Sequence, residues 1–274
     1  MSTPAGPAIL RSSSLTRYRL APNPGPMSLD GTNSYLIGVP DAAGRGRCVV
    51  VDPGPPDEQH LQELAAAGTV ELILITHRHA DHTAGSARLH EITGAPVRAA
   101  DPRHCHGGPA LEGDETIHAA GVQIRVIATP GHTSDSVCFH LPEDGADRSG
   151  TPAGSVLTGD TILGRGTTML DFPDGKLGDY LASLDLLERL GGATVLPAHG
   201  AVRPHLDAVA RAYRAHRRDR LAQIRAALRT LGRDAGVQEV ADAVYADVDP
   251  AVRRAAEISV AAQLEYLRTE YDRR

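Results

Sequence analysis

The sequence predicts an α/β protein in which sheets are sandwiched between helices, an αββα layering, followed by a small helical region. Three observations support this fold class. Short apolar segments alternate with helical segments up to about residue 203. Several of the apolar segments end on His or Asp, and after residue 203 only helical patterns remain. We therefore expect one domain over residues 1–203 and a second over residues 204–274.

The strand and helix patterns follow each other in a regular order. Apolar or alternating segments that are bounded by Gly and Pro predict strands. These segments are 32–38, 48–52, 70–76, 96–100, 121–127, 137–141, 155–160 and 194–200. A turn around residues 41–46 makes the first two strands a hairpin. Helical spacing predicts helices over 57–67, 83–92 and 179–190, and in the C-terminal region over 205–231, 237–246 and 251–271.

The composition fits a globular protein of 274 residues with 41% apolar residues and no Trp. The three cysteines are scattered, which indicates a reducing compartment rather than a disulfide framework. The N-terminus has no signal-peptide pattern and no apolar stretch has the length of a membrane span. We expect a cytoplasmic protein with no membrane partner, and a homodimer is left open.

The charge is unevenly distributed. The net charge of −6 argues against a generic nucleic-acid binder. Arginines nevertheless cluster early in the C-terminal region, at positions 203, 211, 214, 217, 218 and 220. They are either a solvated helix face or a basic surface for an anionic partner.

A possible metal site follows the predicted strand 70–76. Residues 77–82 read His-Arg-His-Ala-Asp-His, so four ligand-type side chains lie within six positions at a strand end. Imidazole and carboxylate are common zinc ligands, and the end of a strand is where an α/β fold exposes chemistry. His77 and His79 can turn toward one ion, while Asp81 and His82 can turn toward a second.

Three further strand ends or loops carry His132, Asp160 and His199. Each has an ordinary structural interpretation by itself, as a turn residue, a helix cap or a buried histidine. Together they complete a two-metal site. We assign His77, His79 and His132 to the first ion and Asp81, His82 and His199 to the second, with Asp160 as the bridge. Two zinc ions are expected, although manganese or iron suits the same ligands. Asp52 is either a turn residue or a group that orients a His ligand.

The motifs Thr76–His82, Pro130-Gly131-His132-Thr133, Gly159-Asp160 and His199-Gly200 resemble those of the metallo-β-lactamase fold. Segments 23–38 and 159–168 resemble more closely the beta-lactamase-like protein 2 group, whose members carry a small winged-helix-like C-terminal domain. The resemblance implies a hydrolase. Two-zinc β-lactamases have Cys where this chain has Asp160, so antibiotic hydrolysis is not expected.

The expected mechanism is metal-assisted hydrolysis with two ions about 3.5–4 Å apart. Asp81, His82 and Asp160 are the expected catalytic residues, and Asp81 orients the attacking water and takes its proton. In loop 164–168, Arg165 and Thr167 are expected to bind substrate, together with Asn33; an ordinary flexible loop is the alternative.

Three functions are consistent with the sequence. The first expectation is a phosphodiesterase, an endoribonuclease acting on single-stranded RNA. It is favoured by the resemblance, because one animal member has that activity, and by the arginine cluster. A thioesterase or other acyl-ester hydrolase is favoured by the fungal members of the group, which release polyketides from a carrier protein, and by the net acidity. A nucleic-acid-binding module built on the C-terminal helices ranks last, because binding alone does not require seven ligands.

Overall fold

Two β-sheets form the centre of the computed structural model, which describes residues 9–41, 46–145, 154–246 and 253–272. The first sheet has the strand order β1-β2-β3-β4-β5-β6 and the second β11-β10-β9-β8-β7. The strands of the first sheet are β1 (Leu10–Arg11), β2 (Thr16–Leu20), β3 (Asn33–Ile37), β4 (Arg47–Val51), β5 (Thr69–Leu74) and β6 (Val97–Arg98). Those of the second are β7 (Thr116–Ala119), β8 (Val122–Ala128), β9 (Val137–Leu141), β10 (Ser155–Gly159) and β11 (Thr194–Pro197).

The pairing of the strands brings the ligand-type residues to one end of the sandwich. β3 and β4 form the predicted antiparallel hairpin, whose turn residues 42–45 lie outside the described residues. β4 and β5 run parallel, so the segments after Val51 and Leu74 leave the first sheet at the same edge. β10 and β11 are also parallel, which places Asp160 and His199 side by side at the end of the second sheet.

Alternating side chains divide the sheets into an inner and an outer face. In β4, Val49 and Val51 belong to the core between the sheets, where they pack with Phe139 of β9. Cys48 and Val50 point to the other side, into a cluster with the outer helices. The inner core therefore joins the two sheets, and each outer face is left for helices.

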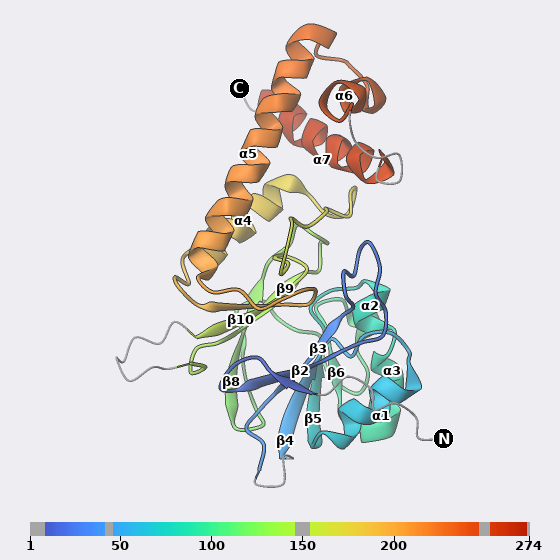
Figure 1. Ribbon diagram of the computed structural model, residues 1–274, viewed down its shortest axis with the longest axis vertical. Coiled ribbons are helices and arrows are strands. Elements are labelled where there is room, and N and C mark those ends of the chain that lie inside the picture. The colour runs from blue at the N-terminus through green and yellow to red at the C-terminus, as the bar shows by residue number, and fades with distance from the viewer. Residues whose placement is uncertain (1–8, 42–45, 146–153, 247–252, 273–274) are drawn as a thin grey trace.

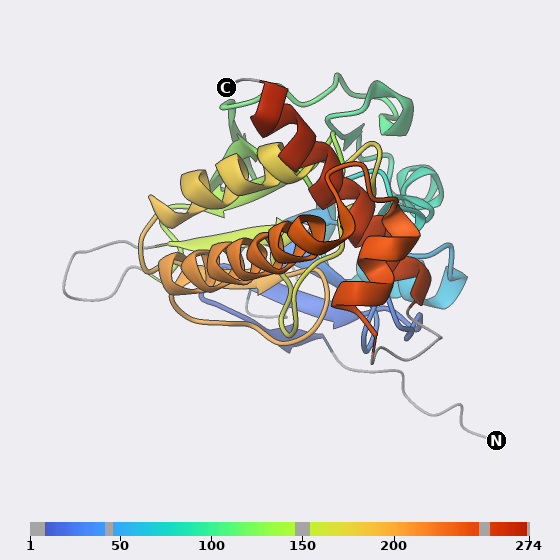
Figure 2. The same cartoon turned by 90° about the horizontal axis from the view of Figure 1, so that it is seen from above.

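Helices cover both outer faces, which confirms the αββα layering (Figures 1 and 2). α1 (Glu58–Ala66) and α3 (Ser86–Thr93) cover the first sheet, with Leu61, Leu64 and Leu89 fully buried. α4 (Leu177–Glu188) and the first part of α5 (Leu206–Leu231) cover the second. The remaining helical segments are α2 (Ala80–Thr83) and the 3-10 turn η1 (Pro102–His104).

The helix predicted over 83–92 begins later than predicted, as α3 at Ser86, and a separate short helix, α2, ends at Thr83. The break lies at Gly85, where a Cβ would approach Leu61 Cδ2 to 2.8 Å and the carbonyl oxygen of Pro55 to 2.9 Å. The chain bends here because backbone from the loop after β4 lies too close for a side chain. The predicted stop at Gly94 is confirmed, since Gly94 caps α3 in the left-handed conformation.

The C-terminal region consists of α5, α6 (Val237–Val244) and α7 (Arg253–Asp272), which rise above the sandwich in Figure 1. Residues 205–246 and 253–272 contain no strand, so the described part of this region has helices without a wing. Leu228, Val240 and Val260 share one hydrophobic cluster with Tyr180 of α4 and Val195 of β11. The boundary at residue 204 stays a prediction, because this core is continuous across it. None of the described helices is long and apolar enough to cross a bilayer.

Candidate metal centre

The His-rich motif lies at the carboxyl end of β5, where the chain turns into α2. His79 is the residue before α2, and Asp81 and His82 lie within its single turn. The rings of His77 and His82 lie close together, with centroids 4.0 Å apart. His77 and His82 are buried, whereas His79 and Asp81 are partly exposed.

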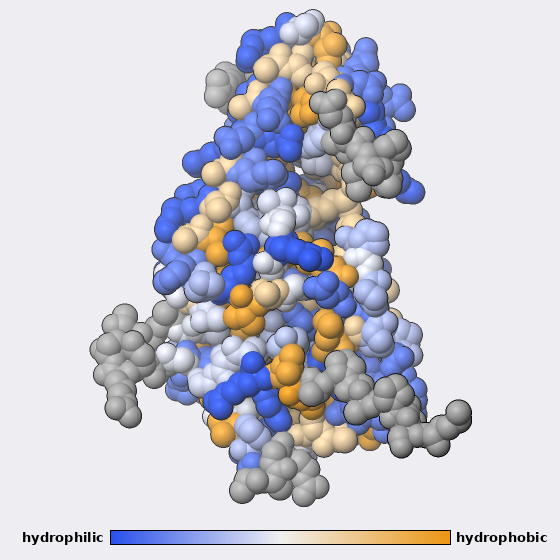
Figure 3. All heavy atoms as spheres, viewed as in Figure 1, coloured by the Kyte–Doolittle hydropathy of each residue, from blue (hydrophilic) through white to orange (hydrophobic). Residues whose placement is uncertain are grey.

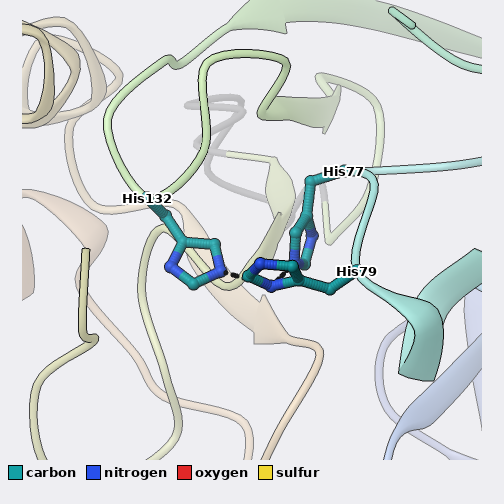
Figure 4. A group of neighbouring side chains, drawn as sticks. All are labelled: His77, His79 and His132. Carbon is teal, nitrogen blue, oxygen red and sulfur yellow. Dashed lines mark hydrogen bonds between the residues drawn. The ribbon is translucent and has the colours of Figure 1, made fainter. Parts of the chain in front are cut away.

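The first group joins three imidazole rings, which come from the loop after β5 and the loop after β8 (Figure 4). His79 Nδ1 lies 3.1 Å from His77 Nε2 and 3.1 Å from His132 Nε2. The three rings are nearly perpendicular to one another in edge contacts, with centroids 4.8 Å apart. Three nitrogens therefore point at one small volume.

The second group consists of Asp81, His82 and His199. His199 Nε2 lies 3.2 Å from an Asp81 carboxylate oxygen, and His82 Nε2 lies 3.6 Å from the same oxygen. Asp160 reaches both groups: its Oδ1 is 3.3 Å from His199 Nε2 and its Oδ2 is 3.8 Å from His132 Nε2. The structure thus brings the seven predicted ligands together, and His77, His82 and Asp160 form a further group of possible ligands. The division of the ligands between two ions stays a prediction.

Each of the five histidines points one ring nitrogen into the centre and holds the other on a protein group. His82 Nδ1 contacts a carboxylate oxygen of Asp52 at 2.8 Å, and His79 Nε2 contacts Asp171 at 3.1 Å. The remaining partners are Thr76 Oγ1 for His77, the Met169 carbonyl for His132 and the Gly31 carbonyl for His199. Such partners fix the tautomer and orientation of metal-ligating imidazoles.

The polar atoms at the middle of the cluster indicate that the donor set fits divalent cations. His82 Nε2, His199 Nε2 and Asp160 Oδ1 are buried and have no hydrogen-bond partner among the described residues. Buried polar atoms are normally satisfied, because leaving them unpaired costs free energy. Nitrogen and carboxylate donors that converge in this way suit a transition metal, so a cation would satisfy all three atoms.

Burial and the neighbouring charges shift the pKa values of the histidines in this cluster in opposite directions. Burial and the neighbouring histidines hold the pKa of His77 well below its ordinary value. Burial alone would raise the pKa of Asp160, but His82 and His199 hold it well below the usual range. For His199, burial would lower the pKa, yet the nearby carboxylates of Asp160 and Asp81 raise it to about 10.

A cavity of about 640 Å³ opens from the centre toward the C-terminal helices. Its lining includes His132 and Asp160, and two of the predicted substrate residues, Arg165 and Thr167. Arg165 pairs with Asp30 at 3.5 Å. Figure 3 shows hydrophobic and strongly hydrophilic residues side by side on the face below the C-terminal helices.

The third predicted substrate residue, Asn33, lies elsewhere, which corrects that prediction. Asn33 is buried, and its side-chain amide donates to the carbonyls of Pro197 and Gly200 at 3.0 and 2.9 Å. It does not line the cavity. These two hydrogen bonds join β3 to the chain on either side of His199. They also satisfy the buried amide, which would cost free energy if it were left unpaired.

Sequence reasoning missed Asp171, which lies far along the chain from the motif. Its carboxylate contacts both Arg78 and His79, and Asp174 lies 3.2 Å from the same Arg78 guanidinium. Arg78 therefore neutralises two carboxylates beside the first group of ligands. No spacing signal links residue 171 to residues 77–82, and only the fold brings them together.

The sequence profile described as the metallo-beta-lactamase superfamily matches residues 27–199. The chain belongs to this superfamily. Its relatives include a lactamase-like protein of Penicillium aethiopicum, 34% identical over 260 residues, 90% of this chain and 78% of the relative. An atrochrysone carboxyl ACP thioesterase of Aspergillus chevalieri is 32% identical over 86% of this chain and 75% of the relative. A beta-lactamase-like protein 2 homolog of Caenorhabditis elegans is 32% identical over 89% and 81%, which confirms the predicted resemblance.

Solved structures are similar to this superfamily member over nearly its whole length, including the C-terminal helices. A beta-lactamase domain protein of Burkholderia ambifaria has a TM-score of 0.76 at 20% identity, over 98% of this chain and 90% of that chain. This likeness shows the fold alone, and it includes the helices after residue 204. A protein solved in a di-iron-bound form has a TM-score of 0.50 at 26% identity, over 66% of this chain and 92% of that chain.

Proposed function

We propose that this protein is a dinuclear zinc-dependent hydrolase of acyl thioesters. The observation that carries the proposal is the position of Asp160, which reaches both ligand groups and also lines the 640 Å³ cavity. Manganese or iron suits the same ligands. One relative is an atrochrysone carboxyl ACP thioesterase, and one structural neighbour was solved in a di-iron-bound form.

The ligand geometry assigns each group of residues a part in the reaction. His77, His79 and His132 would hold one ion, and Asp81, His82 and His199 the other, with Asp160 between them. When bound, two divalent cations supply Lewis acidity and acidify a water molecule. Asp81 is partly exposed, whereas His82 is fully buried. Asp81 therefore orients the attacking water and receives its proton, while Asp52 and Asp171 keep the imidazoles in place.

The walls of the cavity support an acyl substrate. The apolar part of the lining includes Pro26, Met27, Leu29, Leu163, Met169 and Ala256 of α7. Apolar surfaces bind acyl chains by removing them from water. Met27 is 56% exposed and lines the cavity, so its side chain is open to contact with a ligand.

The clustering of arginines in the sequence suggests an RNA-binding surface, but the structure pairs two of them with carboxylates. Arg211 pairs with Asp207 and Glu188, and Arg214 pairs with Asp185 and Glu188. A phosphate backbone needs unpaired cations along an exposed track. These two arginines are already neutralised by carboxylates of α4 and α5, so the endoribonuclease, which was the first expectation from the sequence, becomes the alternative function.

A side-by-side assay tests the proposal. The purified protein is loaded with Zn²⁺ or Mn²⁺ and offered a panel of acyl thioesters and unstructured single-stranded RNA. We expect metal-dependent thioester hydrolysis that is lost in Asp160→Ala. If no thioester in the panel is hydrolysed, the proposal is contradicted. RNA cleavage that is lost in Asp160→Ala would establish the alternative.

A further inference from the structure

Arg217 of α5 is a buried cation in the wall of the cavity that holds the metal ligands. Only 5% of its surface is exposed, and it lines the cavity together with His132 and Asp160. One terminal nitrogen donates to the carbonyl of Thr168, and the guanidinium lies 5.2 Å from the ring centroid of Tyr180. Arg217 is therefore positioned by the loop before Met169 and by α4, close to His132.

The charge of Arg217 has no counter-ion in the described part of the chain. No carboxylate in the described residues forms an ion pair with Arg217. The Nε of Arg217 is buried and has no hydrogen-bond partner there. A buried charge is normally paired, because removing it from water costs free energy that an opposite charge offsets. This contrasts with Arg211 and Arg214 of the same helix, which both have carboxylate partners.

A second arginine lines the same cavity one helical turn later. Arg220 lies 4.7 Å from the ring centroid of Tyr245 and donates to the side chain of Gln223 at 2.8 Å. Both of its partners are uncharged, and His216 lines the cavity beside it. The carboxylate in this lining, Asp160, faces the histidines of the metal centre. The end of the cavity formed by α5 is thus cationic, while Met27, Leu29 and Leu163 contribute an apolar part of the lining.

We propose that Arg217 and Arg220 form an anion subsite, so that the substrate is a thioester that carries a second, negatively charged group. This inference rests on the proposed function and specifies the substrate. The planar guanidinium of Arg217 suits an oxyanion, either a carboxylate or a phosphate, which would supply the missing counter-charge. The apolar walls would cover the carbon chain between that group and the scissile bond.

Two pairs of substrates distinguish the two sources of the anion. Adipyl and hexanoyl thioesters of N-acetylcysteamine differ by a carboxylate on the acyl chain. Hexanoyl thioesters of phosphopantetheine and pantetheine differ by a phosphate on the thiol arm. We expect the metal-loaded enzyme to prefer the anionic member of one pair by about tenfold or more in kcat/KM, as expected for a charge-assisted hydrogen bond.

The variants separate anion binding from a structural role of Arg217. Arg217→Met should reduce the preference to less than about twofold, while Arg217→Lys keeps part of it because the charge remains. Arg220→Met should weaken it as well. Arg218→Met is the matched control, since Arg218 is the next residue along α5 and is exposed, and the preference should be unchanged.

The outcomes distinguish this inference from the proposed function. Equal hydrolysis of both members of both pairs by the wild-type enzyme would overturn the anion subsite alone, whether or not the Arg217 variants fold. A full preference retained in Arg217→Met would overturn it too. No hydrolysis of any thioester would contradict the proposed function, and with it the subsite.

Discussion

The carboxylate of Asp52 contacts His82 Nδ1 at 2.8 Å, and both side chains are buried. The same carboxylate accepts hydrogen bonds from the backbone N–H and the hydroxyl of Thr76, at 2.8 and 2.7 Å. Asp52 therefore anchors both the strand end that starts the motif and the imidazole that points its Nε2 at Asp81 and Asp160. The sequence left Asp52 open between a turn residue and an orienting group, and the structure shows the contacts of the second.

Asp52→Asn should weaken metal binding without removing a ligand. The amide cannot accept from both Thr76 and His82 as the carboxylate does, so His82 loses its fixed orientation. We expect an affinity for the more weakly bound ion about 10–100-fold lower, measured by competition with a chromogenic chelator. Asp114→Asn, an exposed position far along the chain, is the control. Unchanged affinity in Asp52→Asn would show that the contact is not needed.

Asp160→Asn should lower both the metal content and the rate of hydrolysis. Asp160 lies between the two ligand groups, so its replacement by Asn removes the one negative charge that both groups share. We expect fewer than two ions per chain by elemental analysis and at least about a hundredfold loss of kcat/KM. Full metal content with full activity would exclude Asp160 as the bridge.

Removal of metal by a chelator should destabilise the folded protein. Without a cation, His82 Nε2, His199 Nε2 and Asp160 Oδ1 are buried and have no hydrogen-bond partner among the described residues. Free metal at a hundred times its Kd stabilises a folded protein by about 2.7 kcal/mol, so we expect a lower Tm that rises again on reloading with Zn²⁺. Thermal unfolding followed by circular dichroism measures this, and the same Tm in both states would count against a metal site.

Gly164→Ala should displace the loop that carries His199. A Cβ at Gly164 would lie 2.3 Å from the backbone nitrogen of Ala201 and 2.5 Å from the carbonyl carbon of Gly200. Backbone cannot move as cheaply as a side chain, so we expect a loss of about 1–3 kcal/mol in the free energy of unfolding, measured with urea. Gly113→Ala is the matched control, because its Cβ would meet only Ala128 at 3.6 Å. Equal losses in both variants would show that the close approach is unimportant.

His60 should make the protein less stable as the pH falls. Burial, with Arg19 nearby, lowers the pKa of His60 from 6.5 to about 4. The unfolded chain takes up this proton near pH 6.5, whereas the folded protein does so only near pH 4. The unfolded state therefore binds more protons in this window, and folding loses about 2 kcal/mol between pH 7.5 and pH 5.

Urea unfolding at these two pH values measures the effect. His60→Gln should lose this part of the pH dependence, while His118→Gln, at an exposed position, should keep it. A wild-type pH dependence in His60→Gln would assign the effect to other groups.

Local signals predicted much of the fold. Alternation in segments such as 48–52 fixes which side chains share a face, because the strand period is two, and the structure places Val49 and Val51 inside and Val50 outside. The break at Gly85 was not predicted, because it results from contact with Pro55 and Leu61 rather than from the local sequence.

The sequence by itself determined the types of chemical group at this site. His77, His79, Asp81 and His82 adjoin one strand, so their proximity follows from short-range geometry. Asp171 against His79, Asn33 beneath the His199 loop and the unpaired charge of Arg217 were decided only by the tertiary structure. The physical reason is that these contacts join segments far apart in sequence. The role of each of these side chains, orienting a metal ligand, joining two segments or lining the cavity, depends on which residues the tertiary structure brings into contact with it.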